Sequence, residues 1–177
     1  MSVAKLKNKL SFPDFPNENH DVIDWPCIDN SVKFPDDYIE FIHNYGTGRI
    51  ANFLVIFNPF AGNDEVNFFK QKDLILEDLK LLKEEDPDYY RYKLYPVSEG
   101  ILPIGVTDNG DYIFWVMSDI KDSNRWNTAI IASRSPDIEF FNESVTSLIE
   151  GLLSKRIKST SLPDRFPTEP IDFSVIR

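Results

Sequence analysis

The 177-residue sequence predicts an α+β fold: a single domain in which a mainly antiparallel central sheet is flanked by helices. Three observations lead to this prediction. Apolar residues with helical spacing occur toward both ends of the chain, and segments rich in β-branched and aromatic residues lie between them. These segments follow one another through short turns, which favours antiparallel pairing. Because 42% of the residues are hydrophobic, the chain has enough apolar material for an ordered interior.

The N-terminal residues 1–29 are expected to form an extension packed on the domain. Three prolines interrupt it, with Asn and Asp between them, so we expect mostly loop after a short first helix. The first clear helix begins at Pro35, where Asp37 and Glu40 have the spacing of a capping box. Gly46 is expected to end this helix. Its apolar stripe consists of Tyr38, Phe41, Ile42 and Tyr45.

A strand and a second helix are expected next. Residues 53–57 are β-branched and aromatic and end at Asn58-Pro59, which predicts a buried strand followed by a turn. From about Lys72 to Glu85, Ile75, Leu79 and Leu82 line one helical face. This amphipathic helix is expected to lie on the sheet.

The strongest local signal is a hairpin over residues 101–117. Two apolar runs flank Asn109-Gly110, the dipeptide that best supplies two positive φ angles in a type I′ turn. Residues 127–133 and 138–141 predict two further strands. A last amphipathic helix is expected from about Glu143, with Asn142 as its N-cap. Residues 156–177 are polar and interrupted by prolines, and they are expected to form a tail.

The charge of the chain narrows the choice of partner. A net charge of −10 and a pI of about 4.6 disfavour direct binding to nucleic acid or to an anionic membrane, and a partner with a basic surface fits better. Residues 11–48 carry seven of these net negative charges, because Lys33 alone opposes eight acidic residues. The eight are Asp14, Glu18, Asp21, Asp24, Asp29, Asp36, Asp37 and Glu40. Such a segment is either a solvated, solubilising surface or a docking surface.

No metal or cofactor is predicted. Besides carboxylates the chain offers only His20, His43 and Cys27 as ligands, without the spacing of a zinc site. Residues 46–51 match G-x-G-x-x-A, but they follow a helix and lead into a strand, so a pyrophosphate would meet the wrong end of the helix. Asp108 and Asp111 are expected to serve the hairpin turn, because an EF-hand needs about twelve loop residues.

No catalytic residue is predicted either. The sequence has no G-x-S-x-G elbow, and carboxylate pairs are expected by chance among 29 acidic residues. His43 is the best candidate for a general base. Because it lies off the apolar stripe of its helix, it is expected to be an ordinary histidine at the surface or at the boundary of the core. An enzyme is therefore not expected, and an acidic-site hydrolase is the weakest alternative.

Aromatic residues offer a second kind of binding determinant. Trp115 and Trp126 are either core side chains or anchors for a partner, since indoles are enriched in interface hot spots. Because Phe114 and Trp115 alternate along one strand, one sheet face is expected to be covered by helices and the other to be free for binding. The candidate partner-binding residues are Asp36, Asp37, Glu40, Trp115 and Trp126.

Several motifs occur along the chain and are specific as an ensemble. They are Phe34-Pro35-Asp36-Asp37-Tyr38-Ile39-Glu40-Phe41-Ile42 with Tyr45-Gly46-Thr47-Gly48, then Phe57-Asn58-Pro59-Phe60, then residues 100–111 with Phe114-Trp115, and finally Trp126 before a strand and Arg134 after it. Together these motifs resemble the SUKH superfamily, whose members include fungal cell-wall synthesis regulators and bacterial immunity proteins. The resemblance covers residues 30–155. Glu99 and Ile104 depart from it, standing where the family often has a second Gly and an aromatic residue.

The resemblance implies a SUKH-like core domain over residues 30–155 that binds another protein without catalysis. It implies an immunity protein that neutralises a cognate bacterial toxin, often a nuclease. The alternative is an intracellular regulatory adaptor without a toxin partner. Residues 1–12 lack the apolar stretch of a signal peptide and Cys27 is the only cysteine, so the cytoplasm is the expected location.

Overall fold

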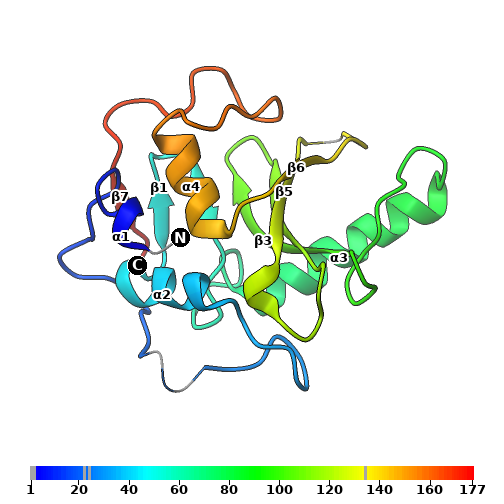
Figure 1. Cartoon of the computed structure of the whole chain (residues 1–177), viewed down its shortest axis with the longest axis horizontal. Helices are drawn as coiled ribbons and strands as arrows, with labels where there is room; N and C mark the ends of the chain where they lie inside the picture. Colours follow the sequence, from blue (N-terminus) through cyan, green and yellow to red (C-terminus); the bar gives the residue numbers. More distant parts are fainter. Residues whose placement is uncertain (1–2, 22, 24, 134) are drawn as a thin grey trace.

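A seven-stranded antiparallel sheet organises the structure, a computed structural model that describes residues 3–21, 23, 25–133 and 135–177 (Figure 1). Its order is β6-β5-β4-β3-β2-β1-β7, so five of the six neighbouring pairs are consecutive in the chain. This confirms the predicted α+β class. The strands are β1 (Gly48–Ile50), β2 (Leu54–Ile56), β3 (Ile101–Thr107), β4 (Tyr112–Val116), β5 (Asn127–Ile131), β6 (Glu139–Phe141) and β7 (Phe173–Val175).

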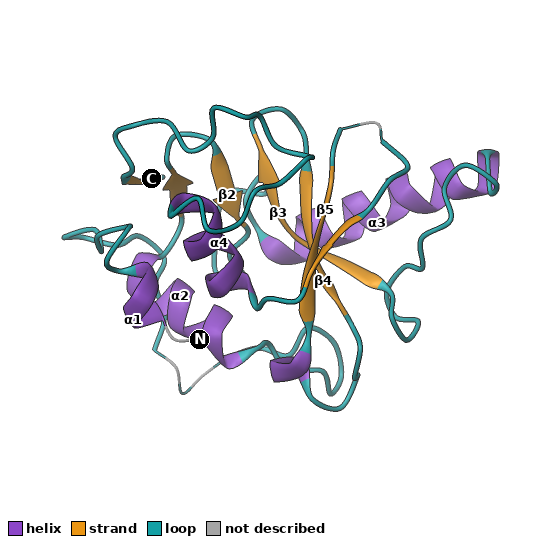
Figure 2. Cartoon of the chain, turned by 45° about the horizontal axis from the view of Figure 1, so that its top comes forward, coloured by secondary structure: helices purple, strands orange, loops and turns teal. Residues whose placement is uncertain are grey.

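Helices cover both faces of this sheet. Three of them, α1, α2 and α4, contact one another on one face, while the long α3 crosses the other face behind β3 (Figures 1 and 2). Within the described ranges no helix is long and apolar enough to cross a membrane. The helices are α1 (Val3–Leu6), α2 (Asp36–Tyr45), α3 (Phe68–Glu85) and α4 (Val145–Leu153), with a short 3₁₀ turn, η1 (Ser123–Arg125).

The main core lies beneath α2 and α4. The predicted stripe of α2 is confirmed, because Tyr38, Phe41, Ile42 and Tyr45 are all buried. On β4, Phe114 and Trp115 point to opposite faces and are 0% and 1% exposed. The expectation that one sheet face is free for binding is therefore wrong at this strand.

The hairpin is present, but its predicted turn type is wrong. Gly110 has a φ of 82°, whereas Asn109 does not have a positive φ, so a type I′ turn is excluded. The Gly110 N–H donates to the Thr107 carbonyl at 3.0 Å, and the Thr107 N–H donates to the Asp111 carbonyl at 2.9 Å. This longer loop places a single left-handed glycine after an ordinary β-turn.

Two predicted helix caps are also wrong. The N-cap of α2 is Pro35, which makes no side-chain cap hydrogen bond, so the capping box that the spacing of Asp37 and Glu40 predicts is absent. The N-cap of α4 is Ser144 instead of Asn142. Helix α3 begins four residues before the predicted start, because the Asn67 side chain accepts the N–H groups of Phe69 and Lys70.

The two ends of the chain contribute to the same sheet and core. Val3, Leu6 and Leu10 are buried in the main core. Strand β7, within the segment expected to be a tail, pairs with β1 and completes one edge of the sheet. Neither β1 nor β7 was predicted from the sequence.

Candidate partner-binding groove

A groove of about 890 Å³ opens beside the N-terminus of α2 and contains one of the predicted site residues, Asp36. We call it the α2 groove. One wall comes from Ile23 and from residues between Trp25 and Ile39, and the other from the β4–β5 connection, residues 120–124. Two of its apolar side chains are exposed, Ile23 at 89% and Ile120 at 43%.

Hydrogen bonds join the two walls. The Asp36 N–H donates to the Asn124 Oδ1 at 2.7 Å, and the Asn124 Nδ2 donates to the Asp36 Oδ2 at 2.9 Å. The Asp122 Oδ1 accepts the Asn124 N–H at 3.2 Å, which fixes η1 at the rim. Because both walls are tied together in the free protein, the groove is preformed.

An aromatic cluster forms the floor beneath these walls. Phe34 contacts the half-buried Trp25 edge to face, with ring centroids 5.5 Å apart, and stacks on Tyr38 at 5.3 Å. Tyr38 lies against Trp115 at 5.0 Å, and burial raises the pKa of its hydroxyl well above the usual range. That hydroxyl donates to the Phe57 carbonyl. The floor is therefore continuous with the main core.

Trp115 and Trp126 are core side chains, so the prediction that they anchor a partner is not supported by their placement. They are 1% and 3% exposed, and their rings lie 5.7 Å apart. The Trp126 Nε1 donates to the Asp119 carbonyl at 2.6 Å, at the base of the β4–β5 connection. Trp126 thus supports the groove wall from below, without offering surface to a partner.

The adjacent carboxylates Asp36 and Asp37 have different roles in the structure. The Asp37 Oδ2 accepts the backbone N–H of Thr146 at 3.0 Å and its hydroxyl at 2.9 Å. Thr146 is in the first turn of α4, so the Asp37 carboxylate caps a second helix, where negative charge is favoured. Asp36 is exposed, and Glu40 is half-buried one turn further along α2.

The remaining candidates have ordinary structural roles. His43 contacts the His20 carbonyl through its Nδ1 at 3.0 Å. Asp108 pairs with Arg49. Asp111 is buried, and its carboxylate accepts the Thr107 hydroxyl at 2.6 Å and the Ser133 N–H at 3.0 Å. These hydrogen bonds stabilise the hairpin turn. Across the residues that the structure describes, no three His, Cys, Asp or Glu side chains gather where they could hold a metal ion.

Sequence reasoning missed the apolar side chains of the groove. Ile120 is an isolated apolar residue between Asp119 and Lys121, and Ile23 and Trp25 interrupt an acidic stretch. Apolar residues in otherwise polar loops were the available signal. Two residues of the earlier prediction, Asp24 of the acidic segment and Arg134 of the family motif, lie outside the described residues.

The antiparallel sheet, the helices on both faces and the motifs along α2 and β3–β4 define an α+β domain of a recognisable family. The chain matches the SMI1-KNR4 cell-wall family, SUKH_6, over residues 29–149, and it therefore belongs to the SUKH superfamily. This superfamily includes toxin immunity proteins and cell-wall regulators, and its members are generally non-enzymatic. Comparison with curated proteins and with solved structures gave no match.

Proposed function

We propose that the chain is a non-enzymatic immunity protein of the cytoplasm that binds and neutralises a cognate toxin through the α2 groove. The observation that carries this proposal is the preformed groove in which Ile23 and Ile120 are exposed beside the Asp36 carboxylate. Family membership supports it, because toxin immunity proteins are among the members of the superfamily.

The groove has the composition of a small protein-binding surface. Ile23, Trp25 and Ile120 provide apolar surface. Lys33 and Lys121 line the groove beside Asp36 and Asp122, and Glu40 adds a negative charge one turn along α2 from Asp36. Apolar anchors in a preformed pocket contribute most of the affinity of an interface, while marginal charges mainly raise the association rate. A basic loop of the toxin with one apolar side chain would complement this surface.

The test is neutralisation in cells. The toxin domain of a large secreted protein encoded beside this gene is expressed with and without the chain, and growth is measured. Rescue of growth together with a purified one-to-one complex supports the proposal. Failure to bind any toxin domain encoded nearby would contradict it and favour the regulatory adaptor.

Single substitutions locate the contact surface. Ile120→Ala is expected to weaken toxin binding about 30-fold, as for a hot spot of about 2 kcal/mol, and to leave the melting temperature unchanged. Leu81→Ala is the matched control, because Leu81 is 53% exposed on α3, on the opposite face of the sheet. Equal affinities of the two variants, measured by calorimetry, would exclude the α2 groove as the contact.

A further inference from the structure

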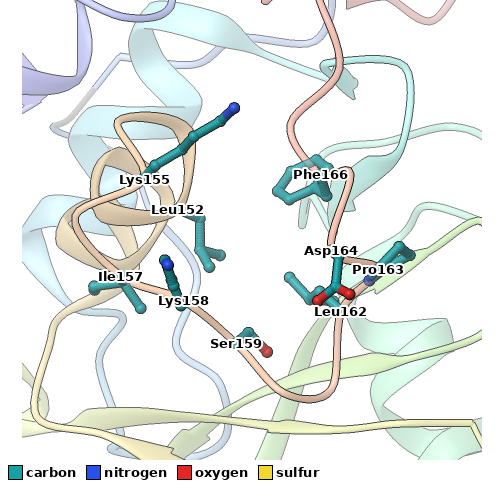
Figure 3. A pocket seen from close by; sticks show the side chains of 9 residues that line it. All are labelled: Leu152, Lys155, Ile157, Lys158, Ser159, Leu162, Pro163, Asp164 and Phe166. Carbon is teal, nitrogen blue, oxygen red and sulfur yellow. The ribbon is translucent and has the colours of Figure 1, made fainter.

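A second cavity lies between the end of α4 and the chain that follows it. We call it the tail pocket; its volume is about 290 Å³, at the lower end of the range for small-molecule sites. Figure 3 shows Leu152, Lys155 and Lys158 along one side, and Asp164, Pro163 and Phe166 along the other. The pocket is distinct from the α2 groove, since they share no lining residue.

The interior of the tail pocket is apolar. Leu152 and Leu162 are buried at its base, and Ile157 and Phe166 are half-buried beside them. The Phe166 ring lies 5.0 Å from the ring of Phe53, which fixes its orientation. A ligand with an apolar body would therefore contact hydrocarbon on more than one side.

The rim of the pocket carries charges that have no partner among the described residues. Lys155, Lys158 and Asp164 are exposed and make no ion pair with any residue that the structure describes. Arg156 differs, because it pairs with Glu143 at 2.7 Å and with Glu150 at 3.1 Å. Lys155 has a φ of 59°, the left-handed conformation that often ends a helix, and here it directs the chain away from α4 after Ser154.

Polar contacts hold the segment that forms the pocket. The Glu139 carboxylate of β6 accepts the Thr160 N–H at 2.9 Å, the Ser161 N–H at 3.1 Å and the Ser159 hydroxyl at 2.6 Å. The Arg156 Nη2 donates to the Ser147 carbonyl at 3.1 Å. Because these bonds order the chain before any ligand arrives, little conformational entropy remains to be lost on binding.

We propose that the tail pocket binds a small organic carboxylate with an apolar body. Lys155 and Lys158 supply positive charge at the rim for the carboxylate, and the body lies against Leu152, Leu162 and Phe166. Two kinds of molecule share this chemistry: a simple aryl or alkyl carboxylate, and an apolar α-amino acid whose ammonium group meets Asp164.

The experiment uses the full chain with phenylacetate and with L-phenylalanine as probes, followed by calorimetry and by amide chemical shifts. Saturable binding of either probe with shifts confined to residues 152–166 is expected. Lys155→Ala combined with Lys158→Ala should weaken that binding at least tenfold. Lys70→Ala combined with Lys80→Ala is the control of equal charge change, since both lysines are exposed on α3.

Asp164→Asn distinguishes the two sources. If the natural ligand is an amino acid, the Asp164→Asn variant binds phenylalanine more weakly than the parent chain does and binds phenylacetate no worse. If the natural ligand is a simple carboxylate, the parent chain does not bind phenylalanine. The variant then binds phenylacetate more tightly than the parent chain, because the negative charge of Asp164 has been removed. The proposal is overturned if neither probe binds the parent chain, or if both lysines can be replaced without effect on affinity. All variants change exposed side chains, and a thermal melt of each verifies folding.

Discussion

The α2 groove and the tail pocket differ in both charge and support. Residues 11–48, which include α2, carry seven net negative charges, whereas residues 154–165 carry three net positive charges in a chain of net charge −10. The segments that line them lie apart in Figure 1, with α2 toward the bottom of the view and the chain that follows α4 at the top. Among the lining residues the contrast is smaller, because Lys33 and Lys121 offset Asp36 and Asp122 in the groove, whereas two lysines oppose Asp164 alone in the tail pocket.

The means of support differ as well. The α2 groove rests on buried rings, with Trp115 and Trp126 beneath the walls. The tail pocket depends on ionised carboxylates, because Glu139 and Glu143 bind the segment that encloses it. Loss of packing should therefore damage the groove, while loss of charge should damage the pocket.

The largest effect is expected at the floor of the groove. Trp126→Ala should lower the free energy of unfolding by about 3 to 5 kcal/mol, because it removes a buried indole and the hydrogen bond to the Asp119 carbonyl. Urea denaturation measures this loss. If Trp126→Ala is as stable as the parent chain and has lost only toxin binding, Trp126 is an anchor for the partner and not a core side chain.

The next effect separates two neighbouring carboxylates. Asp37→Ala should cost about 1.5 to 3 kcal/mol, since it removes a charged acceptor from the first turn of α4. Asp36→Ala should change stability by less than about 1 kcal/mol, because its contacts are exposed. Thermal melts of the two variants side by side give the answer. If they are equally stable, the cap from α2 to α4 is not important for folding.

A smaller effect is expected at the hairpin, away from both surfaces. Gly110→Ala should cost about 1 kcal/mol, because its φ of 82° strains any side chain. The added Cβ would lie 3.4 Å from the Ser133 Oγ, an ordinary contact, so backbone strain is the main cost. Toxin and carboxylate binding should be unchanged. A melting temperature equal to that of the parent would argue against the left-handed glycine.

The smallest effect is a response to pH that is confined to the tail pocket. Burial alone would raise the pKa of Glu139, but hydrogen bonds from Ser159, Thr160 and Ser161 outweigh it and hold the pKa below 4.5, its usual value. Hydrogen bonds from Ser147 and Arg156 likewise lower the pKa of Glu143. Because the pKa of each carboxyl is lower in the folded state than in the unfolded state, the ionised carboxylates stabilise the folded state. This stabilisation is complete above pH 4.5, the pKa in the unfolded state, and is lost as the pH falls through the folded-state pKa values.

Hydrogen exchange of residues 155–166 between pH 6 and pH 3.5 measures this response, after correction for the intrinsic exchange rate. Protection of this segment should fall in the acidic range before protection of the groove floor does. Glu139→Gln combined with Glu143→Gln should remove most of the difference. Protection that is lost equally in both regions would mean that the carboxylates do not hold the tail pocket specifically.

The sequence predicted what depends on local pattern and missed what depends on contacts between distant segments. The stripe of α2 and the hairpin of β3 and β4 follow from residue spacing alone, and both are present. The capping box predicted for α2 is absent, because the Asp37 carboxylate accepts a hydrogen bond from Thr146, 109 residues away. Local spacing cannot indicate a partner at that separation.

The same limit explains the missed edge strand and the misplaced anchors. Strand β7 exists because Phe173 packs against Gly48 and Tyr45, and nothing in its own three residues signals this. Trp115 is buried because α2 covers its face of the sheet while α3 crosses the other face, and alternation along β4 does not show that both faces are covered. Of the candidate site, the acidic residue Asp36 was predicted and its apolar neighbours were not.

The most direct test of the central claim is the salt dependence of association with the cognate toxin, measured by stopped flow. Asp36→Asn combined with Glu40→Gln should slow association at low salt and flatten its dependence on ionic strength, because exposed charges are screened over roughly 8 to 10 Å near physiological salt. Glu85→Gln combined with Asp88→Asn makes the same charge change at the exposed end of α3 and should leave the rate near that of the parent chain. Association that is independent of salt, or equal slowing by both double variants, would contradict docking at the α2 groove.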